Sequence, residues 1–277
     1  MKTNLTLGFS PCPNDTFMFY PLVHGLVDTG SITFEERLED VETLNRQAIE
    51  GVLDVTKVSY AAFGHIREQY ALLRSGSALG RGCGPILVAR DDMPPSALSG
   101  KTIAIPGRYT TAHLLLRLFD PTLENFLEMP FNEIMDAVMA GRADAGVIIH
   151  ESRFTYRGFG LHQLVDLGEW WESESGLPIP LGGIVARRSL GAQTVSTIEK
   201  ALSAGVDYAR ANPGAAAHYI REHAQEMSDE VCSSHIELYV NDFSQQLGDE
   251  GEHAVSELLR RAENAGIIPE SKCGLFI

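Results

Sequence analysis

A histidine that directly follows an apolar run is the residue of this sequence best placed to carry out chemistry. Residues 145–149 read AGVII. This run is too short for most helices and rich in β-branched side chains, so it predicts a buried strand. Ligands of open α/β sheets bind just beyond the carboxyl ends of the strands. Because histidine titrates nearest neutrality, His150 could accept or donate a proton there, although its position fits a loop hydrogen bond equally well.

A lysine lies in another predicted strand, residues 54–59, which read DVTKVS. Lys57 and Ser59 share one parity, so both side chains point to the same side of that strand. A lysine is costly to bury unless it is paired, so Lys57 indicates a cleft and an anionic partner. A lysine on the solvated face of an edge strand is compatible with the same pattern.

A polar turn, residues 10–16, reads SPCPNDT and follows a short apolar strand. Asn14, Asp15 and Thr16 are expected to cap the next helix, whose free backbone N–H groups would suit a carboxylate or phosphate. Cys12 could be a nucleophile or a small packing residue. No motif pairs it with a base, so we favour packing.

The elements that must position these residues occur twice along the chain. Gly51 and Asp54 close a helix and begin a strand, and Gly141 and Asp144 do the same 90 residues later. We therefore expect two similar α/β units in tandem. The second unit consists of a strand at 101–106, a helix at 112–119 capped by Thr110 and Thr111, a helix at 131–139 and a strand at 144–149.

Two similar segments bracket the second unit. Residues 84–90 read GPILVAR, and residues 182–187 read GGIVAR. If one leaves the first domain and the other returns, the two would pair as a double-stranded hinge. The expected domains are residues 1–91 with 188–277, and residues 92–187.

The remaining segments are expected to connect or cover these units. Residues 75–84 are glycine-rich but fit neither a dinucleotide fingerprint nor a P-loop, so we interpret them as a flexible loop. Residues 91–99 are the best candidate linker. Four predicted helices should pack back on the first domain, at residues 194–211, 214–224, 229–247 and 251–265.

This arrangement predicts a cleft lined by the polar ends of both units. Hydroxyls and helix N-termini would suit a small ligand that carries a carboxylate and several hydroxyls. Trp170 and Trp171 could close over it as a lid, although a hydrophobic anchor for their loop is more common. The cleft would receive residues 10–16, Lys57–Ser59, Thr110, Thr111 and His150.

Composition and charge favour a protein that acts on small molecules. The 277 residues are 44% hydrophobic and 21% charged, which is ordinary for a globular protein. The net charge of −15 speaks against a nucleic-acid surface. No window approaches the roughly 18 apolar residues that a membrane span requires, and no secretory pattern begins the chain, so we expect a cytoplasmic protein.

The histidines and the four cysteines show no metal-site spacing, so we expect no metal. We also expect free thiols at Cys12, Cys83, Cys232 and Cys273.

Several long and unusual strings identify a family that this chain resembles. They include LGFSPCPNDTFMFYPLVHG, LEDVETLNRQAIEG, TKVSYAAF, RSGSALGRGCGP, PGRYTTA and IIHESRFTY, and they span nearly the whole sequence. Together they resemble the 1,4-dihydroxy-6-naphthoate synthases, late enzymes of the futalosine route to menaquinone. The resemblance implies a fold like the type 2 periplasmic binding proteins, with two α/β lobes around a cleft.

The resemblance also implies an activity. Cyclic dehypoxanthinyl futalosine would be cleaved to the dihydroxynaphthoate with release of a sugar-derived fragment, without a redox cofactor or metal. The family's catalytic base corresponds to His150. The family's substrate-binding positions correspond to Lys57, Val58, Ser59, Thr110 and Thr111.

From the first turn we add three candidate ligands for the substrate's polar groups, Ser10, Asn14 and Thr16. The alternative is a non-catalytic cytoplasmic solute receptor with the same fold, because one architecture can serve both functions. A receptor has no need of a near-neutral base that faces its ligand, so His150 is the residue that distinguishes the two.

Overall fold

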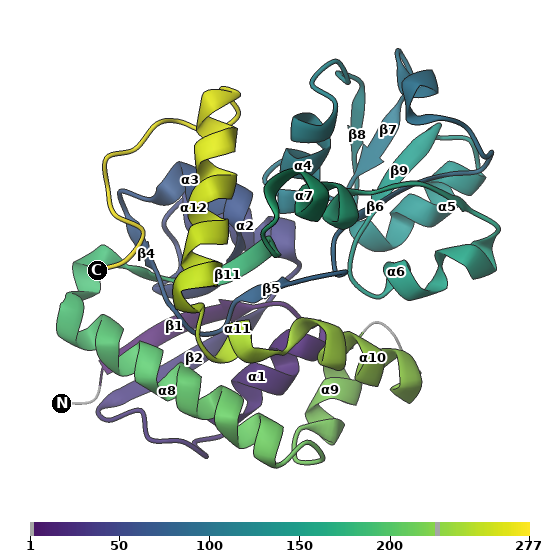
Figure 1. Cartoon of the computed structure of the whole chain (residues 1–277). Coiled ribbons are helices and arrows are strands. Elements are labelled where there is room, and N and C mark those ends of the chain that lie inside the picture. The colour runs from purple at the N-terminus through teal and green to yellow at the C-terminus, as the bar shows by residue number, and fades with distance from the viewer. Residues whose placement is uncertain (1–2, 225–227) are drawn as a thin grey trace.

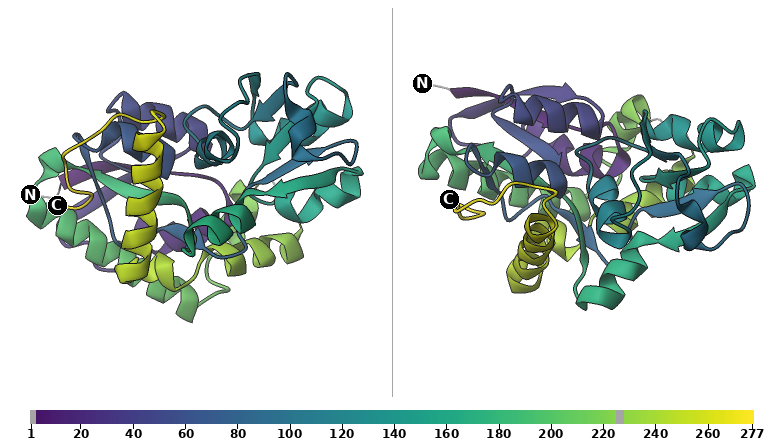
Figure 2. Two further views of the ribbon diagram at one scale, coloured as in Figure 1. Left: turned by 45° about the horizontal axis from the view of Figure 1, so that its top comes forward. Right: turned by 90° about the horizontal axis from the view of Figure 1, so that it is seen from above.

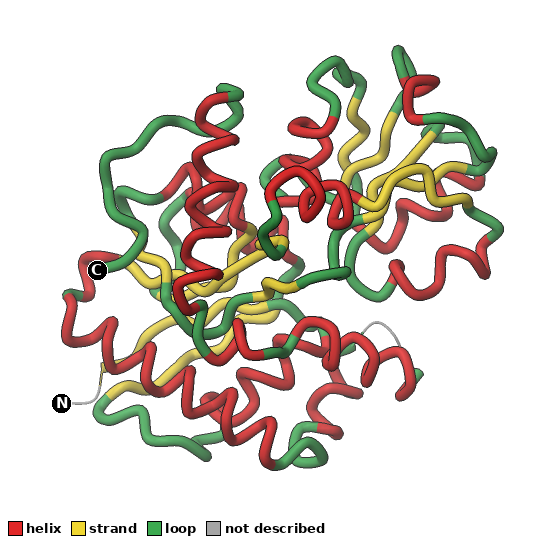
Figure 3. Tube along the Cα trace, viewed as in Figure 1, coloured by secondary structure: helices red, strands yellow, loops and turns green. Residues whose placement is uncertain are grey.

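The chain forms two α/β lobes that lie side by side (Figures 1 and 2). The structure, a computed structural model, describes residues 3–224 and 228–277. Each lobe has its own sheet, with helices packed around it (Figure 3). The predicted α/β class with two lobes is therefore confirmed.

The sheet of the first lobe has the strand order β2-β1-β3-β11-β4, and β5 also pairs with β11. Strands β1, β2 and β3 are parallel, whereas β11 runs antiparallel to β3, β4 and β5. All five residues of β3 are buried because this strand lies at the centre of the sheet. The bounds are β1 Thr3–Phe9, β2 Ile32–Leu38, β3 Val55–Ser59, β4 Tyr70–Leu72, β5 Ala78–Gly80 and β11 Ile179–Arg187.

Helices cover both faces of this sheet. Helices α1 and α8 pack on one face through a hydrophobic cluster, and α3 and α12 pack on the other. Asp40 caps α2 by accepting hydrogen bonds from the backbone N–H groups of Glu42 and Thr43. The bounds are α1 Pro13–Val23, α2 Val41–Ile49, α3 Tyr60–Ile66, α8 Ala192–Ala211, α9 Ala217–His223, α10 Asp229–Tyr239, α11 Asp242–Gln245 and α12 Gly248–Asn264.

The sheet of the second lobe has the order β10-β6-β9-β7-β8. Strands β7, β8 and β9 are parallel, and β6 is antiparallel to β9 and β10. The bounds are β6 Ile86–Ala89, β7 Ile103–Ile105, β8 Phe126–Glu128, β9 Ala145–Ile148 and β10 His162–Asp166, with α4 Thr111–Phe119, α5 Ile134–Met139, α6 Ser152–Thr155 and α7 Leu167–Ser175. Short 3₁₀ helices complete the chain at Pro95–Leu98, Phe131–Glu133, Tyr156–Phe159 and Arg188–Leu190.

The tandem repeat expected from the sequence is present in the geometry. Gly51 and Gly141 both have left-handed φ angles, 69° and 71°. Asp54 accepts a hydrogen bond from the backbone of β1, and Asp144 accepts one from Thr102, immediately before β7. In each lobe a strand thus begins beside the strand two places before it in that unit, β3 beside β1 and β9 beside β7.

The predicted hinge is wrong in its pairing. Strand β6 lies between β9 and β10 in the second lobe, and β11 lies between β3 and β4 in the first, so residues 84–90 and 182–187 do not pair. The chain instead leaves the first lobe after β5 and returns to it at β11, and these two segments lie together because Gly80 of β5 pairs with Ile179 of β11. The expected domain limits stay a prediction. Because β5 and β11 belong to the first sheet and β6 belongs to the second, we would place these limits at about residues 81–85 and 176–178.

Three further expectations need correction. Residues 75–80 are buried and end in β5, because β11 supplies backbone partners, so they are no flexible loop. Helix α1 is capped by Cys12, which places Asn14, Asp15 and Thr16 inside its first turn. The helix expected at 229–247 is broken into α10 and α11, because Asn241 adopts an extended conformation and caps α11.

Candidate functional site

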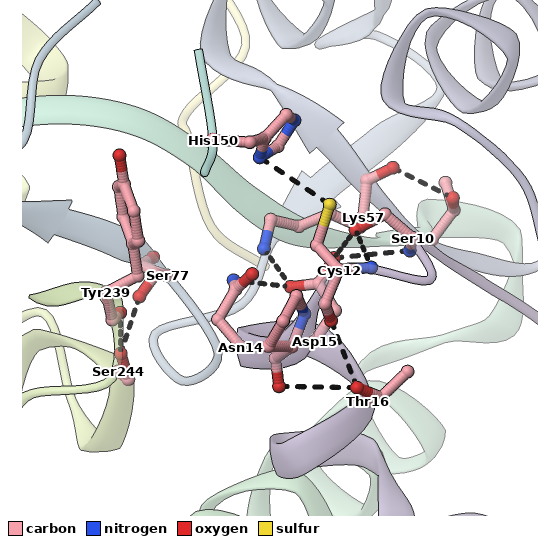
Figure 4. Close-up of polar contacts among 12 residues, drawn as sticks. Ser10, Cys12, Asn14, Asp15, Thr16, Lys57, Ser77, His150, Tyr239 and Ser244 are labelled. Atoms are coloured by element: carbon pink, nitrogen blue, oxygen red, sulfur yellow. Dashed lines mark hydrogen bonds and ion pairs between the residues drawn. The ribbon is translucent and has the colours of Figure 1, made fainter. Parts of the chain in front are cut away.

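His150 lies just beyond the carboxyl end of β9, as predicted. Its φ of 56° is left-handed, which is uncommon for a residue other than glycine. Such conformations persist where the surrounding structure enforces them, and they cluster at functional sites. Here the turn between β9 and α6 aims the imidazole toward the first lobe (Figure 4).

Three side chains surround the imidazole of His150. Its Nδ1 lies 3.6 Å from Sγ of Cys12. The Phe131 ring meets it edge-on at 4.9 Å between centroids, and the His235 ring lies nearly parallel to it at 6.0 Å. Burial lowers the pKa of His150 to about 4, partly offset by the charge of Asp15, so the ring is neutral near pH 7 and able to accept a proton.

Cys12 is a buried thiol and not an activated nucleophile. Burial, followed by the negative charge of Glu151, raises its pKa far above the ordinary value. No sequence motif pairs this residue with a base, but the fold places His150, 138 positions away in the chain, beside it. The interpretation as a mere packing residue is therefore incomplete.

Asp15 and Lys57 form a buried ion pair beside these two residues (Figure 4). Lys57 Nζ lies 2.5 Å from Asp15 Oδ1, and the residues are only 6% and 1% exposed. Ser10 donates its hydroxyl proton to Asp15 Oδ2 over 2.7 Å, and its backbone N–H reaches the same oxygen at 3.2 Å. The central position of β3 makes an edge-strand lysine the wrong interpretation, and Asp15 is the anionic partner that the sequence did not reveal.

Asn14 links this ion pair to a second histidine. Its Nδ2 donates to Asp15 Oδ1 over 3.0 Å, which directs its Oδ1 to His235 Nε2 at 2.9 Å. An amide oxygen only accepts, so Nε2 of His235 carries a hydrogen. Burial, followed by the nearby His150, lowers the pKa of His235, so this ring is also neutral.

Asn14, Asp15, Lys57, His150 and His235 line a cavity that is partly open to solvent. Its walls come from both lobes and from the crossing segments near Gly84 and Leu181. His150 also borders a smaller hollow, and Cys12 lines that hollow but not the main cavity. The predicted site residues that the cavity brings together are Ser10, Asn14, Lys57, Val58, Ser59, Thr110, Thr111 and His150.

The three predicted threonines already have hydrogen-bond partners. Thr110 caps α4 by accepting from His113 N and donates to Gly107 O. Thr111 donates to Leu181 O over 2.6 Å, and so joins α4 to β11 across the two lobes. Thr16 is fully buried, donates to the carbonyl of Cys12 and lies outside the cavity lining, which does not favour the expected contact with a substrate.

Ser59 is held by a residue that the sequence did not single out. Asn45 of α2 accepts from Ser59 N at 2.8 Å and donates to Ser59 Oγ at 3.1 Å. The same Nδ2 lies 3.3 Å from Tyr109 O in the second lobe. Asn45 therefore fixes one wall of the cavity and also contacts the opposite lobe.

Trp170 and Trp171 do not form a lid in this structure. Trp171 is fully buried and donates from its indole nitrogen to Pro178 O. Trp170 meets the Phe119 ring edge-on. The pair therefore anchors α7, as the more common role of such residues suggested.

One group of side chains has the composition of a metal site. Cys12, His150 and Glu151 place one potential ligand atom each within 4.8 Å of one another. Zinc binds the thiolate form of cysteine, whereas burial keeps Cys12 protonated. Within the described residues no fourth such side chain joins the group, and the expectation of no metal stays a prediction.

Comparison with known proteins identifies the family. The family model described as menaquinone biosynthesis matches residues 5–264. A Thermus thermophilus protein named 1,4-dihydroxy-6-naphtoate synthase is 52% identical over 275 residues, which cover 99% of each chain. The chain belongs to this menaquinone biosynthesis family. A Streptomyces coelicolor protein of the same name is 46% identical over 270 residues, covering 96% of this chain and 95% of its own.

Solved structures agree with the fold of this family member. A crystal structure of an Archaeoglobus fulgidus protein matches with a TM-score of 0.89 at 36% identity, covering 96% of this chain and 98% of that one. A Candida albicans protein described as having the generic periplasmic binding protein fold matches with a TM-score of 0.70 at 16% identity, covering 98% and 92%. The periplasmic-binding-protein-like fold is thus confirmed. No helix in the described part of this family member is long and apolar enough to cross a membrane.

Proposed function

We propose that this protein is a carbon–carbon lyase that converts cyclic dehypoxanthinyl futalosine to 1,4-dihydroxy-6-naphthoate in the cytoplasm, with His150 as the general base. Support comes from the family, from two near-full-length relatives that carry this synthase's name, and from one observation at the site. That observation is a neutral imidazole at a strand end that borders a cavity between two lobes.

The chemistry requires a base and groups that stabilise developing negative charge. The substrate ring becomes aromatic once protons leave and a carbon–carbon bond breaks, which provides the driving force. His150 would remove a proton, a step that contributes about 10²–10⁴-fold. The N-termini of α1 and α4 border the cavity and would stabilise oxyanions there.

Binding would rest on the polar lining of both lobes. Ser59 and Lys57 contribute from β3, and Asn14 contributes from α1. The hydroxyls of Thr110 and Thr111 are engaged, and the Thr110 N–H donates to Gly107 O, so the start of α4 would contribute chiefly through the backbone N–H of Thr111. The proposed reaction uses neither a cofactor nor a metal.

Direct turnover tests this proposal. The pure protein would be incubated with cyclic dehypoxanthinyl futalosine, and the naphthoate would be followed by absorbance and mass. We expect each enzyme molecule to complete many turnovers, with one naphthoate formed for each substrate molecule consumed. Tight binding of the compound without any product would instead favour the solute receptor.

A further inference from the structure

Three side chains that can bind a soft cation meet at one point beside the main cavity. They are Cys12, His150 and Glu151, and one potential ligand atom of each lies within 4.8 Å of the other two. All three line the smaller hollow, and of the three only His150 also lines the main cavity. A cation held among them would therefore lie beside the main cavity and affect it through the imidazole.

The spacing of these atoms suits a tetrahedral zinc ion. Zinc binds sulfur at about 2.3 Å and imidazole nitrogen at about 2.0–2.1 Å, so two such ligands at a tetrahedral angle lie about 3.6 Å apart. Sγ of Cys12 and Nδ1 of His150 are 3.6 Å apart and face each other (Figure 4). A carboxylate oxygen of Glu151, within 4.8 Å of both atoms, would need to approach by at most about 1.5 Å.

The backbone brings two neighbouring residues to the same point. Consecutive side chains of an extended strand point to opposite sides, so His150 and Glu151 would diverge if β9 continued. The left-handed φ of 56° at His150 ends this alternation, and both side chains come within reach of Cys12, which caps α1. The turn that aims the imidazole therefore also assembles the three ligand atoms.

Ligand type and charge favour zinc over a hard cation. Thiolate and imidazole suit Zn²⁺, whereas Mg²⁺ and Ca²⁺ prefer oxygen ligands. The Cys12 thiol loses its proton to solvent as the sulfur–metal bond forms, because a coordinating thiol is deprotonated outright. One thiolate, one carboxylate and one neutral imidazole then balance the two positive charges of the ion, as a poorly solvated site requires. Water in the hollow would fill the fourth position.

We propose that Cys12, His150 and Glu151 form an inhibitory zinc site, in which the cation withdraws the His150 imidazole from use as a base. A neutral imidazole has one nitrogen that accepts and one that carries a hydrogen. Zinc on Nδ1 takes the lone pair and leaves the hydrogen on Nε2, so neither nitrogen can accept a proton. The inhibition rests on the proposed function, because it needs His150 as the base. The binding of the metal does not.

Cobalt spectroscopy tests the metal site directly. The protein would be freed of metal with a chelator and titrated with Co²⁺, which gives a strong near-ultraviolet charge-transfer band only when a thiolate binds it. We expect one cobalt ion per chain with this band. Zn²⁺ should then displace the cobalt, because such sites bind zinc more tightly. A cobalt complex without the thiolate band would overturn the proposal, whatever the turnover.

Two substitutions and a matched control assign the ligands. Cys12→Ala should abolish the band and weaken zinc binding more than about 100-fold, since loss of even an outer-shell partner costs about 10–100-fold. Glu151→Gln should weaken zinc binding and keep the band. Cys232→Ala removes another buried thiol, in the hydrophobic cluster of α1 and α10, and should change neither readout. Equal zinc affinity in the wild type and in Cys12→Ala would mean an adventitious ion only.

Turnover in zinc-buffered solution tests the inhibition. The wild-type protein should lose activity as one zinc ion binds, and Mg²⁺ at the same concentration should have no effect. Cys12→Ala should keep its activity without zinc and need more than about 100-fold more zinc for equal inhibition, in line with its weaker binding. Unchanged turnover with one zinc ion bound per chain would overturn the inhibitory role.

The two proposals fail separately. If the metal-free protein shows no turnover, the proposed function fails, and the cobalt spectrum still decides whether the site exists. If Cys12→Ala does not fold, the wild-type spectrum tests the thiolate and Glu151→Gln tests the carboxylate.

Discussion

His150 and Cys12 lie 3.6 Å apart, and burial moves their pKa values in opposite directions. It lowers the pKa of the imidazole and raises that of the thiol, because both charged forms lose hydration. A thiolate–imidazolium pair, which cysteine nucleophiles use, is therefore disfavoured on both sides. The same burial makes the neutral imidazole available as a base.

Substitution of His150 tests its assignment as the base. His150→Gln keeps a polar group of similar size, so we expect the fold and most ligand affinity to remain. The value of kcat should fall by about 10²–10⁴-fold, the contribution of one general base. Steady-state kinetics and circular dichroism check this, and more than about a tenth of the wild-type activity would refute the assignment.

The pH profile provides an independent check on the same residue. The pKa of His150 is lowered to about 4, so the active neutral form is complete above that value and is lost as the pH falls through it. The value of kcat/KM should therefore show no His150 limb between about pH 5 and 8. A limb near pH 6.5 that disappears in His150→Gln would show that the base has an ordinary pKa.

Loss of Lys57 should cost stability as well as binding. Lys57→Met leaves the carboxylate of Asp15 buried without its cation, which typically costs about 3–5 kcal/mol. Urea unfolding should show this loss, and Asp15→Asn in the same chain should restore part of it. Arg37→Met breaks the exposed pair with Glu35 and should cost less than about 1 kcal/mol. Equal losses of unfolding free energy in Lys57→Met and Arg37→Met would contradict a stabilising buried ion pair at Lys57.

At the scale of helices and strands, the sequence predicted local structure better than partners. Strand β9 and helix α4 lie within one residue of the bounds predicted for them, because period and capping are local properties. The pairing of β5 with β11 joins residues about a hundred positions apart, which no local pattern encodes. His235 was missed for the same reason, since its contact with Asn14 spans 221 positions. Of the site, the sequence predicted the strand-end residues but not the side chains that hold them.

The contact between α2 and the turn before α4 depends on a glycine. Gly107 has a φ of 152°, and a Cβ there would lie 2.5 Å from the carboxyl group of Glu42. Gly107→Ala should therefore push α2 away from the turn and raise KM about tenfold or more, because overpacking costs about 1–3 kcal/mol. Gly100→Ala is the matched control: φ is 74° with no atom within 4 Å, so only backbone strain is expected. Equal KM values in both variants would refute this contact.

At the scale of the whole molecule, hydrogen bonds from residues 109–111 cross between the lobes beside the cavity. Tyr109 N donates to Glu42 Oε2 over 3.1 Å, and Thr111 donates to Leu181 O. Such contacts would form only when the lobes are together. Because the chain crosses between them at two adjacent segments, β5 and the start of β11, rotation about these segments would open the cavity.

We therefore expect the lobes to close on the ligand, and we expect closure to depend on Glu42. Burial raises the pKa of Glu42 to about 6, and this carboxyl faces Arg46, Asn45, Tyr109 and the nearby Glu128. If opening restores the ordinary pKa of about 4.5, closure takes up a proton. The closed state is then favoured below pH 4.5, and this advantage is lost as the pH rises to 6.

Small-angle scattering with and without a hydroxylated naphthoate would measure this closure. The radius of gyration should fall on ligand binding, and less ligand should be needed at pH 5 than at pH 8. Glu42→Gln is neutral at every pH and should remove that difference while leaving closure itself. A radius of gyration that stays constant at saturating ligand would mean a rigid cleft, in which the base on one lobe and Lys57 on the other are already in place. If Glu42→Gln still needs less ligand for closure at pH 5 than at pH 8, a group other than Glu42 causes the pH dependence.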